Sequence, residues 1–141
     1  MKYFFDTSSL IPAFNEDHPH HEASLEAFAR IKKGEGFCGG HTLAEFYSVA
    51  TRLPGKNRLS GDQILLCFED IRSRLTIITL TANEYFDAMR EGAKHGIVGG
   101  LIYDMLLARC ALKARADILY TWNVKHFEQL GPEISKRVRT P

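Results

Sequence analysis

The sequence predicts an α/β fold, a three-layer sandwich in which helices cover both faces of a central parallel sheet. Short segments rich in aromatic and β-branched residues alternate along the chain with longer segments of helical periodicity. This alternation favours a parallel sheet, because each parallel strand needs a crossover to the next strand, and the crossover is usually a helix. The 141 residues, of which 45% are apolar, suffice for one domain, which we expect to span residues 1–141.

Four short segments carry the strand signals. Residues 3–5 are aromatic and run into a cluster of helix-capping side chains, so we expect the first strand to end at Asp6. Residues 75–80 and 118–121 are rich in β-branched and apolar side chains, which indicates buried strands. Residues 36–40 give a weaker signal, since only two apolar residues stand between glycines.

Helical periodicity fills the segments between the strands. We expect helices over residues 10–14, 19–33, 101–114 and 125–130, the last of which precedes a basic tail. Three further helices begin at capping boxes, which satisfy free amides of the first helical turn. The three boxes are Thr42 with Glu45, Ser60 with Gln63, and Thr81 with Glu84. On the helix that begins at Ser60, the predicted core side carries Ile64, Leu65, Phe68 and Ile71.

The composition excludes several classes of protein. A net charge of +1 gives no bulk attraction to nucleic acid or to an anionic membrane. No apolar stretch approaches the ~20 residues of a membrane span, so we expect no membrane association. Asp6 interrupts the apolar core that a secretory signal needs, which favours a cytoplasmic location. The three cysteines lack close pairing, which predicts buried thiols rather than disulfides or a zinc site.

Polar residues stand where the predicted strands end, at the edge where open parallel sheets place their working crevice. Asp6 ends the first strand, Glu45 follows the second, and Asn123 follows the last. Each has an ordinary structural explanation, as a helix N-cap, a capping-box acid and an Asx turn. Asp104 is different, because it interrupts an apolar helix where a charged side chain is costly to bury without a compensating partner.

These four side chains are all oxygen donors, without the His or Cys ligands that zinc prefers. Oxygen ligands in this number suit Mg²⁺ or Mn²⁺, which bridge to phosphate oxygens and activate water for attack on a phosphodiester. We also expect the three carboxylates to lie within a few ångströms of one another, so that mutual repulsion and partial desolvation raise their pKa values in the metal-free protein. The sequence therefore indicates a metal-dependent phosphodiesterase site.

Four sequence blocks stand in order along the chain and together cover nearly all of it: Phe5-Asp6-Thr7-Ser8, Leu43-Ala44-Glu45-Phe46-Tyr47, Gly99-Gly100-Leu101-Ile102-Tyr103-Asp104 and Thr121-Trp122-Asn123. In these blocks the chain resembles the PIN-domain ribonucleases, most closely the VapC-like toxins of toxin–antitoxin pairs. The resemblance implies a PIN-like sandwich and a Mg²⁺-dependent endoribonuclease toxin. It further implies three partners, namely an RNA substrate, a cognate antitoxin protein and a second copy of the chain in a homodimer.

The resemblance also assigns roles to individual residues. It places metal-binding acids at Asp6 and Asp104, a further site acid at Glu45 and a polar site residue at Asn123. Asn123 departs from those family members that have an aspartate at this position. The supporting hydroxyl groups are those of Ser8 and Thr121.

Two other function classes remain open from the sequence. A catalytically silent PIN-fold module would keep the fold for binding RNA or protein, although the three retained acids argue against it. A haloacid-dehalogenase-like phosphatase would use Asp6 as its nucleophile. That family needs an acid two residues later, where this chain has Ser8.

Histidines and basic residues outside these blocks have simpler interpretations. His18, His20 and His21 cluster beside acids at a helix start, which is typical of solvated loop histidines rather than of a metal site. His126 begins the short helix near the predicted site, where capping is a simpler role than substrate contact. Basic residues around position 55 and in the tail are interpreted as solvated surface.

Overall fold

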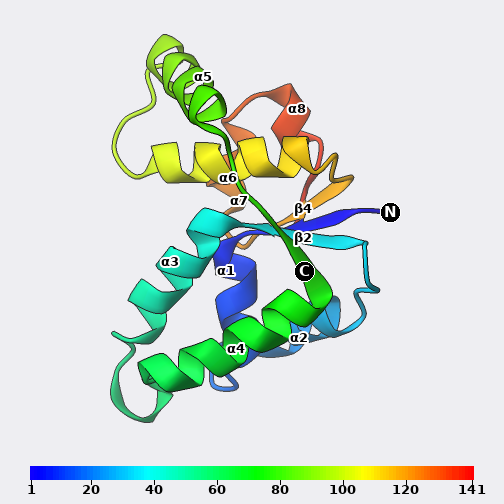
Figure 1. Cartoon of the computed structure of the whole chain (residues 1–141), viewed down its shortest axis with the longest axis vertical. Coiled ribbons are helices and arrows are strands. Elements are labelled where there is room, and N and C mark those ends of the chain that lie inside the picture. The colour runs from blue at the N-terminus through cyan, green and yellow to red at the C-terminus, as the bar shows by residue number, and fades with distance from the viewer.

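The computed structural model describes residues 1–141 and contains one five-stranded sheet (Figure 1). All neighbouring strands run parallel, in the order β3-β2-β1-β4-β5. Helices cover both faces of this sheet, so the predicted three-layer α/β sandwich is confirmed. The strands are β1 (Tyr3–Phe5), β2 (Gly36–Gly39), β3 (Leu75–Ile78), β4 (Ile118–Tyr120) and β5 (Val138–Arg139).

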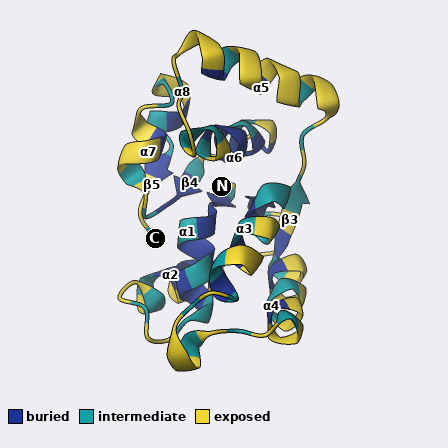
Figure 2. Ribbon diagram, turned by 90° about the vertical axis from the view of Figure 1, so that its left-hand side faces the viewer, coloured by how far each residue is buried: buried dark blue, intermediate teal, exposed yellow.

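The helices divide between the two faces of the sheet (Figures 1 and 2). On one face lie α1 (Thr7–Leu10), the 3-10 turn Ile11–Phe14, α2 (His21–Ala29), α3 (Gly40–Ala50) and α4 (Gly61–Arg74). On the other face lie α6 (Leu101–Lys113), α7 (Val124–Glu128) and α8 (Pro132–Ser135). The remaining long helix, α5 (Ala82–Lys94), packs on α6 and is largely exposed (Figure 2). No helix has the length and apolar character needed to cross a membrane.

Two hydrophobic cores form because successive residues of a strand point to opposite faces of the sheet. Phe5 of β1 packs among Phe28 and Phe46, under the helices of the first face. Its neighbour Phe4 packs with Phe127 in the second core, beneath α6 and α7. Of the three thiols, those of Cys38 and Cys110 are buried and that of Cys67 is half-buried.

Glycines explain why β2 gives a weak strand signal. A Cβ atom at Gly36 would lie 2.5 Å from methyl carbons of both Ile31 and Leu75. A Cβ atom at Gly39 would lie 2.6 Å from Leu107 of α6. The neighbouring side chains fill the space above these glycines, so the strand is fully buried although it has low intrinsic β-propensity.

Two of the three predicted capping boxes are confirmed and one is wrong. Ser60 with Gln63 and Thr81 with Glu84 form complete boxes at the starts of α4 and α5. The helix with Glu45 begins at Gly40, two residues before the predicted cap, and no side chain caps it. Thr42 lies inside this helix with its side chain buried, so Glu45 has no capping role.

The structure adds two elements that the sequence did not predict and corrects the burial of one residue. The tail contains α8 and the edge strand β5, which pairs with β4. These elements have four and two residues, too few for a periodic pattern. Leu65 is not in the core: its exposed fraction is 58%, whereas Ile64 and Ile71 are fully buried.

We predict that Gly36→Ala destabilises the protein by about 1–3 kcal/mol, because the added methyl group overlaps two core side chains. Urea denaturation measures the change in the free energy of unfolding. Gly100→Ala is the matched control, since nothing lies within 4 Å of its added methyl and its φ is −64°. Equal stability of the two variants would show that the core beside β2 is loosely packed.

Candidate active site

Asp6 lies at the carboxyl end of β1 and is the N-cap of α1. Its carboxylate accepts a hydrogen bond of 2.9 Å from the backbone amide of Ser9, the interaction expected of a capping aspartate. Only 2% of the residue is exposed. A buried carboxylate needs several donors, and one helix amide is not sufficient.

Two hydroxyl groups from opposite ends of the chain supply the other donors. Ser8 Oγ lies 2.8 and 3.0 Å from the two carboxylate oxygens of Asp6, and Thr121 Oγ1 donates to Oδ2 at 2.6 Å. These hydroxyls also accept from the backbone that follows β4: Trp122 N donates to Ser8 Oγ and Asn123 N to Thr121 Oγ1, both at 2.9 Å. The network ties the carboxyl ends of β1 and β4 together around one carboxylate.

Burial raises the pKa of Asp6 to about 6, and the hydrogen bonds from Thr121, Ser8 and Ser9 oppose this shift. Desolvation, one of the two expected causes, is dominant. The other expected cause, repulsion from neighbouring acids, does not contribute to the shift. Asp6 is therefore a carboxylate whose negative charge is costly in the metal-free protein.

Glu45 lies on α3 and faces the same edge of the sheet. Thr7, the residue after Asp6, donates a hydrogen bond of 3.0 Å to its Oε1 atom. His41 Nε2, one turn earlier on α3, is 3.7 Å from the same oxygen. The Glu45 side chain is 32% exposed, so this carboxylate remains open to solvent.

Asp104 lies in the first turn of α6, and its side chain is 18% exposed. Burial raises its pKa, and the charge and hydrogen bond of His126 oppose the shift. Nδ1 of His126 is 3.2 Å from Oδ2 of Asp104. This histidine is the compensating partner that an acid in an apolar helix requires, and the capping role predicted for it is wrong.

Three of the four predicted site residues share one hollow. Glu45, Asp104 and Asn123 line a hollow of about 570 Å³ together with His126 and Tyr103. Asp6 is not in its wall but is linked to it through the Thr7–Glu45 and Thr121–Asn123 hydrogen bonds. No group of three or more His, Cys, Asp or Glu side chains has the arrangement of a metal site. The expectation that the three acids form one tight cluster is therefore wrong.

The histidine cluster near the start of α2 has structural roles. The ring of His20 stacks on Trp122, with centroids 3.6 Å apart and an angle of 8° between the planes. His21 Nδ1 lies 2.7 Å from the carbonyl oxygen of Pro12, and His18 Nδ1 accepts from the amide of His20. These contacts hold the loop before α2 beside the end of β4.

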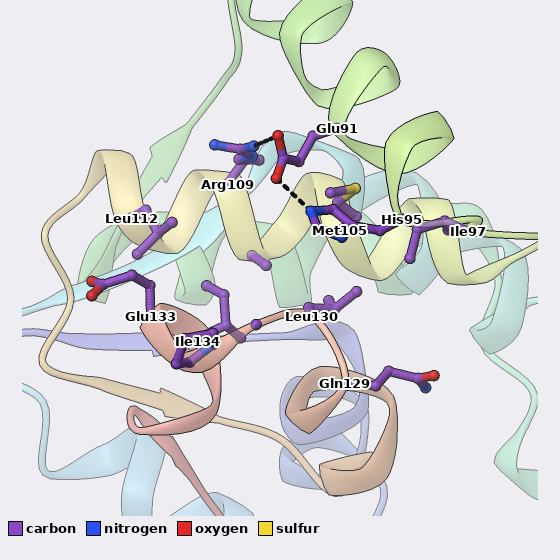
Figure 3. A pocket seen from close by; sticks show the side chains of 13 residues that line it. Glu91, His95, Ile97, Met105, Arg109, Leu112, Gln129, Leu130, Glu133 and Ile134 are labelled. Carbon is purple, nitrogen blue, oxygen red and sulfur yellow. Dashed lines mark hydrogen bonds and ion pairs between the residues drawn. The ribbon is translucent and has the colours of Figure 1, made fainter.

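A second cavity, of about 340 Å³, lies between α6, the end of α5 and the segment from α7 to α8 (Figure 3). No sequence pattern indicated it. Its walls are mainly apolar, with Met105, Leu130 and Ile134 among them. Its charged groups are paired: Glu91 contacts His95 at 2.7 Å and Arg109 at 3.9 Å, and Glu133 contacts Lys136 at 3.2 Å and Arg137 at 3.5 Å. Since these charges are already paired, the cavity offers no free acid or base.

The fold and the acid-lined hollow agree with one family. The model of the PIN domain matches residues 3–131, and the chain belongs to the PIN-domain family. Among its relatives are two ribonucleases of Mycobacterium tuberculosis. Ribonuclease VapC40 is 33% identical over 114 residues, which is 81% of each chain. Ribonuclease VapC27 is 36% identical over 114 residues, or 80% of this chain and 79% of the relative.

Solved structures show the same fold. VapBC2 of Rickettsia felis, bound to a DNA fragment of its promoter, matches 100% of this chain and 99% of its own with a TM-score of 0.66 and 24% identity. Mycobacterium tuberculosis VapC20, described as a toxin that cleaves the sarcin-ricin loop, matches 89% of this chain and 92% of its own, with a TM-score of 0.71 and 17% identity. Both support the PIN-like sandwich.

We predict that the stability of the metal-free protein falls as the pH rises from about 4 to about 6, by up to about 3 kcal/mol from Asp6 alone. The folded carboxyl group has the higher pKa, so in this window the folded state binds more protons than the unfolded state. Urea denaturation at several pH values with EDTA measures the fall, which Asp6→Asn is expected to remove. Asp62→Asn, at an exposed position in α4, is the control. Parallel pH curves for wild type and Asp6→Asn would contradict the assignment.

Proposed function

We propose that this chain is a metal-dependent endoribonuclease that acts as the toxin of a toxin–antitoxin pair. The observation that carries the proposal is the hollow at the carboxyl edge of the sheet, where Glu45, Asp104 and Asn123 meet beside the buried Asp6. The VapC ribonucleases that are similar to this chain over four fifths of its length support RNA as the substrate.

The donor chemistry of the site fits Mg²⁺, or Mn²⁺ in its place. Every acid and amide at the hollow offers oxygen, which these cations prefer. Burial raises the pKa values of both Asp6 and Asp104, so a bound cation would relieve the cost of keeping these carboxylates ionised. In this proposal Asp6 and Asp104 hold the metal, and Glu45 completes the set.

The remaining residues orient the groups that take part in the reaction. When bound, the cation supplies Lewis-acid activation of water and charge neutralisation at the phosphodiester. Glu45 is exposed enough to accept a hydrogen bond from the attacking water, and the Asn123 amide can donate to a phosphate oxygen. Ser8 and Thr121 hold the carboxylate of Asp6 in a fixed orientation. His126 holds that of Asp104 in the same way.

The phosphatase alternative is disfavoured by the surroundings of Asp6. That family needs an acid two residues after its nucleophilic aspartate. The residue two positions later, Ser8, donates to Asp6 and is no acid. The silent binding module remains the alternative that a cleavage assay distinguishes.

The partners follow from the same proposal. We expect a cognate antitoxin protein, as in the VapBC2 structure from Rickettsia felis, and a homodimer. Support for an interface comes from α5, where Tyr85, Phe86 and Met89 are 44%, 63% and 40% exposed on adjoining positions. Such a cluster of exposed apolar side chains is typical of a surface that another protein covers.

We predict that Asp104→Asn and Asp6→Asn each lower the rate of RNA cleavage by about 100-fold or more, because each variant removes a carboxylate from the metal-binding set. Cleavage of tRNA, messenger RNA and ribosomal RNA is measured with added Mg²⁺ and after EDTA. Asp62→Asn controls for the loss of a carboxylate elsewhere on the surface. Full activity in excess EDTA would overturn the role of the metal, and absence of any cleavage by wild type would favour the silent binding module.

We predict that Phe86→Glu converts the proposed homodimer to a monomer, because Phe86 is an exposed apolar residue of α5 and a charge placed in an apolar interface loses its hydration. Size-exclusion chromatography with light scattering gives the mass. Leu66→Glu, at a 72% exposed apolar position on α4, is the matched control and is expected to remain dimeric. If only the α4 variant becomes monomeric, the interface lies on α4 and not on α5.

A further inference from the structure

Two aromatic rings from different helices stack at the rim of the hollow. Tyr103 is in the first turn of α6, next to Asp104, and His41 is in the first turn of α3. Their ring centroids are 4.9 Å apart and their planes differ by 13°. The stacked pair therefore bridges the two helices that carry Glu45 and Asp104.

The Tyr103 ring is accessible although it is large and aromatic. Its exposed fraction is 49%, and it lines the hollow together with Glu45 and Asp104. His41 covers one face of the ring, and His41 itself is held near the carboxylate of Glu45 at 3.7 Å. The result is a flat apolar surface in a fixed position beside the acids.

Resting on the proposed function, we propose that the Tyr103–His41 pair, termed here the stacking platform, binds an unstacked RNA base next to the scissile phosphate. Single-stranded RNA is recognised through bases that stack on aromatic side chains, a contact that every base can make. A phosphate held at the hollow leaves its neighbouring base within reach of the platform, since Tyr103 adjoins Asp104 in the chain and lines the same hollow.

The geometry favours RNA over a protein partner as the occupant. The platform shares its hollow with the acids of the proposed reaction, whereas the exposed apolar side chains of α5 do not line that hollow. The stacking platform thus binds a base of the substrate, a contact that the acids and Asn123 cannot make.

Tyr103→Ala tests the proposal with a fluorescein-labelled single-stranded RNA that the wild-type protein cleaves. Binding is measured by anisotropy in EDTA, and cleavage is measured with Mg²⁺. Loss of one stacked base is expected to weaken RNA binding by about 5- to 100-fold and to raise KM similarly, while kcat changes by no more than about twofold. Tyr103→Phe keeps the ring and is expected to restore binding.

The matched control is Tyr47→Ala. Tyr47 is 46% exposed and lies on α3, the same helix as His41, but its position relative to residues 41 and 45 turns it to another side of the helix. This variant is expected to bind RNA as wild type does. Thermal melts of the three variants check that each is folded at the assay temperature.

RNAs with one abasic nucleotide at each position in turn identify the stacked base. One abasic position is expected to weaken binding by wild type but to have no further effect on Tyr103→Ala, because both changes remove the same contact. Additive losses at every position, or unchanged binding by Tyr103→Ala, would overturn the platform and leave the proposed function intact. A change of oligomeric state without a change in RNA binding would also overturn it, by making Tyr103 part of a protein interface. If wild type neither binds nor cleaves RNA, the proposed function itself fails and the platform with it.

Discussion

The burial of the Asp6 carboxylate is the constraint around which this edge of the sheet is organised. A charged group with 2% exposure requires donors on both oxygens. These donors are the backbone amide of Ser9 and the hydroxyl groups of Ser8 and Thr121. The same hydroxyls then order the backbone at Trp122 and Asn123. One buried charge thus determines where α1 begins, how β4 ends and where the Asn123 side chain is presented.

The position of the second acid depends on packing rather than on charge. Helix α6 approaches β2 so closely that a Cβ atom at Gly39 would overlap Leu107. The absence of a side chain at Gly39 lets α6 lie low over the sheet, with its first turn at the carboxyl edge. Asp104 reaches the hollow from this face, and Glu45 reaches it from α3 on the other face. The site is therefore assembled from both outer layers of the sandwich.

Features that depend on local chemistry were predictable from the sequence, and features that depend on packing between distant segments were not. The alternation of strands and helices predicted the sandwich, and the capping boxes at Ser60 and Thr81 predicted two helix starts. The pattern at Thr42 has the same residue types, but packing moved the helix start to Gly40. Pairing with β4 creates β5, a strand of two residues with no pattern of its own.

The candidate site shows the same division. Residues at strand ends could be predicted as candidate site residues, because parallel strands bring their carboxyl ends to one edge. The need of Asp104 for a partner was also predictable, but His126 as that partner, 22 residues away, was not. Likewise, Asp6, Glu45 and Asp104 were expected to form one cluster. In the structure Asp6 does not line the hollow, and the hydroxyl groups of Ser8 and Thr121 hold its carboxylate, a detail that only side-chain packing determines.

Trp122 makes the carboxyl edge of the sheet observable by intrinsic fluorescence. It is the only tryptophan in the chain, and it lies between Thr121 and Asn123 with its indole NH bonded to Ser24 and its ring against His20. All tryptophan emission therefore originates from one ring at the carboxyl edge of the sheet. The protein carries a native optical reporter there, so cation or nucleic-acid association at this edge can be followed by intrinsic fluorescence without any label.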